Sequence, residues 1–180
     1  GTVTGVQTCA LPISTPQWND AIQAFVPADS LPAGQIPAGS AKGHFALADC
    51  LSSGEDAAVA AAEALGTSAA RGTLPDVGPS AAAPVKSIWT VSGGKGRAWV
   101  DLQNDVTTKD VKLAFQEGFR SVEHLKRYTT LGMATDQGKT SNVLGLAIMA
   151  EMTGASIAET GTAMFRPPYQ PVAMGALAGR

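Results

Sequence analysis

The sequence has few cysteines, few aromatic residues and no strong excess of either charge. Its two cysteines, Cys9 and Cys50, are far apart, so they suggest neither a disulfide framework nor a metal-ligand set. The net charge of −2 at pH 7 gives no reason to expect nucleic acid or an anionic membrane as a partner. No apolar run approaches the roughly 18–20 residues that span a bilayer. A cytoplasmic location is the default expectation.

The two ends of the sequence are treated separately. Residues 1–14 have no helical or strand period and resemble a translated sequencing adapter, so we exclude them from fold reasoning as disordered or artefactual. A genuine N-terminal loop is the alternative. Cys9 is spurious on the adapter interpretation. The last residues, 177–180, stop abruptly, and we expect both ends to be cut.

Residues 15–66 are predicted to form an α/β remnant, the end of a dinucleotide-binding domain. Glu55 and Asp56 suit the first turn of an Ala-rich helix, and Gly66 is a natural stop. A Ser-Ser-Gly sequence at 52–54 is expected to interrupt the helical pattern. The predicted elements are an extended piece at 25–27, a strand at 35–40 that runs into a glycine turn, and helices at 45–51 and 55–65.

Residues 67–86 are rich in Ala, Gly, Pro and Ser without an apolar period, and they predict a linker. A small, mostly helical module at 87–160 is expected to follow. It should open with strands at 87–91 and 98–102 around a glycine-rich turn at 92–96.

Helix signals dominate the rest of this module. Three of the four predicted helices have a capping residue at their start or a glycine at their end. The first helix is expected to begin at Thr107, with Asp110 as its capping partner, and to end at Gly118, and the second to cover 121–128. The third should run from Thr140 or Ser141 to Gly154, and the fourth should start with a capping box at 156–159. Residues 165–171 are Pro-rich and should be extended.

Three runs resemble one protein family, the α subunit of heterotetrameric sarcosine oxidase. They are RYTTLGMATDQGKTSN at 127–142, VDLQNDVT at 100–107 and EGFRSVEH at 117–124. The resemblance extends over roughly residues 99–180. It implies an internal fragment of a flavoenzyme subunit that is inactive alone, with β, γ and δ subunits as partners. It implies no catalytic residue in this chain, because amine oxidation takes place on the β subunit's flavin.

The glycine turn at 38–47, followed by SGEDAA at 53–58, resembles the last strand, turn and helix of flavoproteins with two dinucleotide-binding domains. A turn of this kind places backbone N–H groups beside a dinucleotide, and the resemblance implies bound, non-reacting NAD. Ser40 stands where most relatives have Asp. The fingerprint glycines of a first βα turn are absent, so the segment could not bind a dinucleotide unaided. The residues implied are Gly39, Ser40, Gly43, Phe45 and Leu47, whereas His44 is interpreted as a surface or cap residue rather than a phosphate ligand.

Related flavoprotein dehydrogenase subunits share the frame of the helical module but hold a [2Fe–2S] cluster through four cysteines. The corresponding positions here are Asp101 and Gln103, and near Asp136 and Ser141. Asp, Gln and Ser are poor substitutes for thiolates, so the module is predicted to resemble a [2Fe–2S]-type domain without a cluster.

The run QGKTS at 137–141 leads into a helix and is not a P-loop, because its earlier glycine is missing. In the family the FMN lies between the α and β subunits. Our hypothesis is that Lys139, Thr140 and Ser141, with Arg127, contact the FMN phosphate. The alternative is that Thr140 and Ser141 are helix caps and Lys139 is a solvated charge.

Four charged residues, Glu123, His124, Lys126 and Arg127, lie on one short predicted helix and are interpreted as a solvated or intersubunit face. Residues 161–180 resemble the start of an aminomethyltransferase-like domain that binds tetrahydrofolate. The resemblance implies oxidative demethylation of sarcosine to glycine, with hydrogen peroxide and 5,10-methylenetetrahydrofolate as products and FAD also in the full complex. The alternatives are a non-catalytic scaffold of another flavoprotein complex, and an oxidase for another secondary amine.

Overall fold

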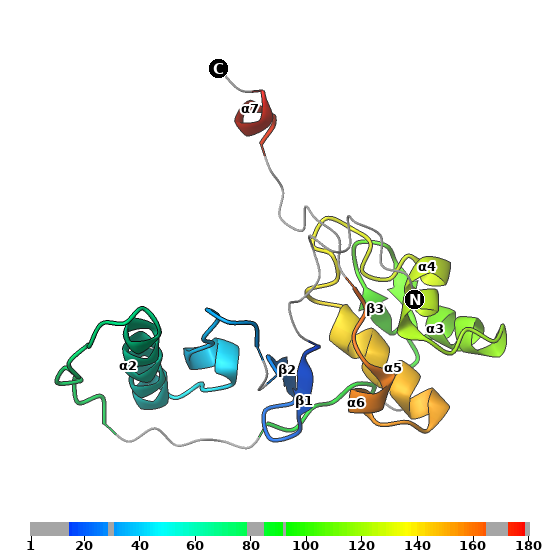
Figure 1. Cartoon of the computed structure of the whole chain (residues 1–180). Helices are drawn as coiled ribbons and strands as arrows, with labels where there is room; N and C mark the ends of the chain where they lie inside the picture. The colour runs from blue at the N-terminus through cyan, green and yellow to red at the C-terminus, as the bar shows by residue number, and fades with distance from the viewer. Residues whose placement is uncertain (1–14, 29–30, 79–84, 92, 165–172, 179–180) are drawn as a thin grey trace. The chain divides into compact units, whose positions relative to one another are not determined.

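The computed structural model describes residues 15–28, 31–78, 85–91, 93–164 and 173–178 (Figure 1). The chain divides into two compact units, with the boundary after Ser87. We refer to the N-terminal unit and the C-terminal unit and describe each by itself. Our expectations for residues 1–14 and for the Pro-rich run at 165–171 lie outside the described residues.

The N-terminal unit begins with an antiparallel hairpin of β1 (Gln17–Asn19) and β2 (Ala24–Val26). Trp18 lies opposite Phe25, and the two rings meet edge to face with centroids 5.0 Å apart. The predicted extended piece at 25–27 is therefore confirmed over its first two residues. The hairpin partner was not predicted.

The predicted strand at 35–40 is wrong. A 3-10 helix, η1 (Gly39–Lys42), replaces its end, and residues 35–38 form no strand. Gly39 has φ 59°, and its N–H donates to Ser53 Oγ at 3.2 Å instead of to a strand partner. Gly43 then ends η1 at φ 94°, packed so closely that a Cβ there would lie 2.9 Å from Ile22 Cδ1.

A single helix, α2 (Leu47–Ala64), continues through the residues where we predicted an interruption. Ser53 faces the η1 turn and binds it, so the Ser-Ser-Gly sequence serves tertiary contact rather than a break. The helix ends at Leu65 with Gly66 at φ 74°, where the Thr67 N–H donates to the Ala62 carbonyl oxygen. The predicted stop at Gly66 is confirmed, because this is the Schellman pattern.

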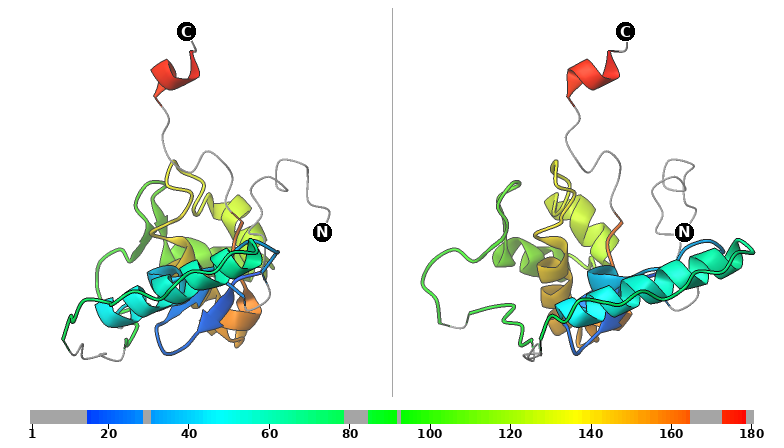
Figure 2. Two further views of the ribbon diagram at one scale, coloured as in Figure 1. Left: turned by 60° about the vertical axis from the view of Figure 1, so that its left-hand side comes forward. Right: turned by 90° about the vertical axis from the view of Figure 1, so that its left-hand side faces the viewer.

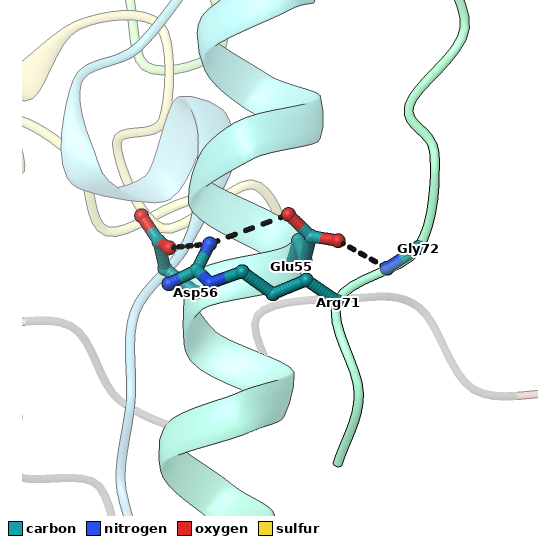
Figure 3. Close-up of polar contacts among 4 residues, drawn as sticks. All are labelled: Glu55, Asp56, Arg71 and Gly72. Atoms are coloured by element: carbon teal, nitrogen blue, oxygen red, sulfur yellow. Dashed lines mark hydrogen bonds and ion pairs between the residues drawn. The ribbon is translucent and has the colours of Figure 1, made fainter.

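The first part of the predicted linker doubles back onto α2 (Figure 3). The Arg71 guanidinium lies 2.6 Å from Asp56 Oδ1 and 3.3 Å from Glu55 Oε2, and the Gly72 N–H donates to Glu55 Oε1 at 2.7 Å. The hydrogen bond to Asp56 and the charge of that carboxylate raise the pKa of Arg71. The residues after α2 are thus held by its side chains.

In the C-terminal unit, β3 (Trp99–Asp101) pairs antiparallel with β4 (Val106–Thr107). The predicted strand at 98–102 is confirmed in part, but its predicted partner at 87–91 is wrong. The tight turn between β3 and β4 explains the difference: Asp101 Oδ1 accepts the N–H groups of Gln103 and Asn104, at 2.8 and 3.2 Å.

The predicted helices of the C-terminal unit are confirmed. They are α3 (Thr108–Gln116), α4 (Val122–Thr129), α5 (Asn142–Thr153) and α6 (Ile157–Thr160); a further short helix, α7 (Met174–Leu177), was not predicted. Capping boxes join Thr107 to Asp110 and Ser156 to Glu159, as expected. The core forms where α5 packs against α3, α4 and α6 (Figures 1 and 2), and its largest fully buried apolar side chains are Leu125, Ile148, Met149 and Val111.

Candidate functional site

The β3–β4 turn is bound to the residues between α4 and α5, which we call the 130–141 loop. Asp101 is 3% exposed, and its Oδ2 accepts the Gly132 N–H at 2.8 Å. Asn104 Nδ2 donates to the Thr130 carbonyl oxygen at 2.8 Å, and Thr135 Oγ1 donates to Gln103 Oε1 at 3.3 Å. The carboxylate of Asp101 therefore organises the turn and the loop together.

These contacts also relate the two residue pairs that we compared with cluster ligands. Asp101 and Gln103 lie on the turn, and Asp136 and Ser141 lie on the loop to which the turn is bound. Asp136 accepts the Gly138 N–H and the Thr140 hydroxyl, each at 3.1 Å. Asp101, Gln103 and Asp136 thus act as hydrogen-bond acceptors within the protein.

Two glycines allow the 130–141 loop to close around Asn142. Gly132 and Gly138 have φ of 67° and 78°, and a Cβ on either would lie 2.1 Å from Asn142 Oδ1. Asn142 Nδ2 in turn donates to the Gln137 carbonyl oxygen at 3.2 Å. A side chain at either glycine would force the loop open, so the loop geometry depends on both positions.

Three of the four residues predicted for the FMN phosphate lie together at the start of α5. Lys139 and Thr140 are exposed, whereas Ser141 is 1% exposed and has no hydrogen-bond partner for its Oγ among the described residues. Ser141 occupies the N-cap position without a side-chain capping bond. An external phosphate could meet its hydroxyl only if the loop opened. Arg127 lies apart from these three in sequence, on α4, where it forms an ion pair with Glu123 at 3.3 Å.

The charged residues of α4 do not all face solvent, and our interpretation is wrong for Lys126. That residue is 6% exposed, and its Nζ donates to the Met164 carbonyl oxygen. Glu123 Oε1 accepts the Met164 N–H. His124 is exposed, with its ring 6.2 Å from that of Phe119. Sequence reasoning missed the role of Lys126 because its partner is a backbone group far along the chain.

The residues predicted for NAD are brought together in the turn before α2. Gly39 and Ser40 begin η1, and Gly43 ends it. Phe45 and Leu47 follow with exposures of 63% and 59%. Cys50 is the first residue of α2 whose backbone N–H donates along the helix, to the Ala46 carbonyl oxygen. The amides before it are the free N–H groups that every helix start carries.

A cavity of about 340 Å³, lined by both polar and apolar residues, borders the same turn. Its polar lining comes from η1, from the residue after Gly43, and from one side of α2: Lys42, His44, Asp49, Ser52, Ser53 and Asp56. Sequence reasoning had treated His44 as a surface residue and the two serines as a helix break. The Ser pair at helical spacing from Asp49 and Asp56 was the signal that these side chains could share a face.

Within the ranges given above, no group of three or more His, Cys, Asp or Glu side chains is placed to hold a metal ion. In the same ranges, no helix combines the length and apolarity needed to cross a bilayer.

Comparison with known proteins relates nearly the whole chain to one family. Residues 95–180 match the sarcosine oxidase A3 domain. The chain is 44% identical over 173 residues to the sarcosine oxidase subunit alpha of Rhizobium meliloti, and 42% identical over 171 residues to that of Corynebacterium sp. strain P-1. Each comparison covers 91% of this chain. The chain spans 17% and 18% of the length of these two relatives.

A solved structure is also similar: L-proline dehydrogenase from P. horikoshii, with 31% identity over 42% of this chain and 16% of that one. Its TM-score is 0.39. By its sequence relatives the chain is a homologue of sarcosine oxidase α subunits, and its residues 95–180 belong to the sarcosine oxidase A3 domain family.

Proposed function

We propose that this chain acts as part of the α subunit of a sarcosine oxidase complex, which oxidatively demethylates sarcosine to glycine. The products would be hydrogen peroxide and 5,10-methylenetetrahydrofolate. The observation that carries the proposal is the 44% identity to a sarcosine oxidase subunit alpha across 91% of the chain. The chain supplies no catalytic residue in this proposal and is inactive alone. Its partners are the β, γ and δ subunits, and the complex works in the cytoplasm.

The N-terminal unit would contribute to an NAD site. Gly39 and Gly43, both at positive φ, shape the turn, and the free amides at the start of α2 can donate to a phosphate. Ser40 is exposed and can form one neutral hydrogen bond with a ribose hydroxyl. Phe45 and Leu47 supply exposed apolar surface beside it. The carboxylate of Asp49, in the first turn of α2, would repel a bound phosphate, so other parts of the full subunit must supply most of the affinity for NAD.

The C-terminal unit would contribute to the FMN phosphate site. Lys139 and Thr140 are exposed at the start of a helix of 12 residues, where an ammonium and backbone amides favour an anion. Arg127 can join them by leaving its exposed ion pair with Glu123, which is a weak interaction. FMN bound there would accept electrons passed on from amine oxidation.

This proposal includes no iron–sulfur cluster. Asp101, Gln103, Asp136 and Ser141 offer carboxylate, amide and hydroxyl groups, which are poor substitutes for the soft thiolates that hold such clusters. The first three already accept hydrogen bonds from the protein. FAD and tetrahydrofolate would bind elsewhere in the full complex. Residues 165–172 and 179–180 of the segment that resembles a folate-binding domain lie outside the described residues.

The first test is to recover the full reading frame and co-express it with the neighbouring genes. The purified complex should show flavin absorption that bleaches on anaerobic addition of sarcosine and returns with oxygen. If the flavin does not bleach with sarcosine but does bleach with dimethylglycine or another N-methyl amine, that amine would become the proposed substrate. A colourless complex would refute the enzyme proposal and leave a scaffold role.

The FMN site has a separate test in the same complex. Lys139→Glu should lower FMN retention after gel filtration, because it reverses the charge at the start of α5. Lys112→Glu is the matched control, since it makes the same change at an exposed position on α3. Equal FMN content in the two variants would remove Lys139 from the site without affecting the assignment of the subunit.

A further inference from the structure

The side chains of α4 hold one residue of the chain that follows α6. Residues 161–164, which we call the strap, connect α6 to the Pro-rich run. At the end of the strap, the Met164 N–H donates to Glu123 Oε1 and its carbonyl oxygen accepts from Lys126 Nζ. Glu123 and Lys126 are three residues apart on α4, so they lie on one face of the helix. Both backbone polar groups of Met164 are thereby bound.

The burial of Lys126 indicates that this contact shapes the unit. A lysine is rarely buried, because removing its ammonium from water is costly unless the N–H groups are bonded. Lys126 is nevertheless 6% exposed. The Glu123 side chain is 29% exposed, and its second oxygen lies 3.3 Å from Arg127. One carboxylate therefore faces the strap on one side and a surface cation on the other.

The route of the strap makes α4 its point of attachment. The chain leaves α6 at Gly161, whose φ of 75° and ψ of −173° suit glycine and turn the chain away from the helix. It then runs to Met164, which contacts α4, without forming helix or strand. α6 packs on α5, and α5 packs on α4, so the strap ties the last helix of this core back to an earlier one.

We propose that Glu123 and Lys126 form a bracket that fixes the direction in which the chain leaves the helical core toward residues 165–180. They are positioning residues, because they act on the backbone of the strap rather than on a substrate. The bracket lies within the region that matches the A3 domain, and it does not depend on the activity of the complex.

Amide hydrogen exchange in the full 180-residue chain tests the bracket. In the unmodified chain, the Met164 amide should exchange at least about tenfold more slowly than an unstructured amide, because it donates to a carboxylate. Lys126→Met keeps the apolar stem and removes the ammonium, and Glu123→Ala removes the acceptor. Each should speed exchange in the strap about tenfold or more, while the buried α5 amides of Leu146 to Ala150 remain protected.

The control is Arg127→Gln, which removes the surface ion pair but leaves both contacts to Met164. It should change exchange in the strap less than about twofold, as expected for an exposed pair. Unchanged strap exchange in both bracket variants, with α5 still protected, overturns the proposal. If either variant loses protection in α5, the unmodified chain decides the question: a Met164 amide exchanging at the unstructured rate overturns the bracket, and a protected one supports it.

Discussion

The two longest described helices obtain their stability in different ways. α2 has 18 residues and none of them is buried, whereas α5 has 12 residues, six of which are buried. Six of the last nine residues of α2 are alanine, the residue with the highest intrinsic helix propensity. α5 is a run of larger apolar side chains enclosed by α3, α4 and α6. Helix propensity thus favours the C-terminal half of α2, whereas packing against neighbouring helices stabilises α5.

The starts of the helices also differ. In the C-terminal unit, α3 and α6 begin with capping boxes, and Ser121 caps α4 by accepting the His124 N–H at 3.2 Å. In the N-terminal unit, α2 begins after Ala46 with no side-chain capping bond. Side-chain caps therefore mark the starts of α3, α4 and α6, whereas α5, like α2, begins without one.

The largest expected contrast comes from truncating one buried and one half-exposed side chain. Ile148→Ala in α5 should lower the free energy of unfolding of the C-terminal unit by about 4 kcal/mol, because the residue is 2% exposed and leaves a cavity. Val59→Ala in α2 should cost less than about 1 kcal/mol. Hydrogen exchange of the α2 and α5 amides in urea measures both, and equal costs would refute the contrast.

Removing the acceptor that organises the 130–141 loop should have the next largest effect. Asp101→Ala leaves the N–H groups of Gly132, Gln103 and Asn104 without their acceptor, so it should destabilise the C-terminal unit by about 3 kcal/mol. Glu151→Ala removes an exposed carboxylate from the same unit and serves as control. Urea unfolding followed by circular dichroism should separate the two variants, and coincident curves would contradict the organising role of Asp101.

A glycine in each helix gives a prediction of opposite sign. Gly54→Ala should stabilise α2 by about 1 kcal/mol, because no atom lies within 4 Å of the added Cβ and alanine favours the helix. Gly145→Ala should destabilise α5 by about 1–2 kcal/mol, because the Cβ would lie 2.4 Å from Leu131 Cδ2 in the core. Exchange rates of the α2 and α5 amides report each change, and shifts of the same sign would defeat the comparison.

The smallest effect concerns capping and pH. The hydrogen bond from the Thr107 side chain, followed by that from the Thr107 backbone, lowers the pKa of Asp110 below its ordinary value of 3.8. Ionised Asp110 therefore stabilises the folded chain at pH values above this ordinary pKa, and the stabilisation is lost as the pH falls through the lowered pKa. Urea midpoints of the unmodified chain and of Asp110→Asn should differ at pH 6 and converge as the pH falls below about 4. A gap that widens on acidification would be inconsistent with the capping bond.

The sequence predicted features whose partners are close together along the chain. The capping boxes at Thr107 and Ser156 and the stop at Gly66 were correct, because all of their hydrogen bonds lie within six residues. The errors at 35–40 and 52–54 share one cause, the contact between Gly39 and Ser53 across 14 residues.

The candidate site follows the same rule. The sequence grouped Lys139 with Thr140, and it grouped the glycines with Phe45. It could not place Asp101 against Gly132, or Lys126 against Met164, because these pairs are 31 and 38 residues apart and one partner in each is a backbone group. Burial of the Ser141 hydroxyl was equally hidden, since it depends on how the loop closes.

The thiol of Cys50 gives the N-terminal unit a built-in reporter. Its Sγ donates to the His44 carbonyl oxygen at 3.0 Å and lies 3.7 Å from the point where a Cβ on Gly39 would stand. Chemical labelling of this sulfur must therefore disturb the turn that carries the proposed NAD residues. In a chain with Cys9→Ser, Cys50 is the one remaining thiol, so the rate at which it is modified measures how often that turn opens. A nucleotide that closes the turn would lower the rate of Cys50 modification, and no introduced probe residue would be needed to detect the change.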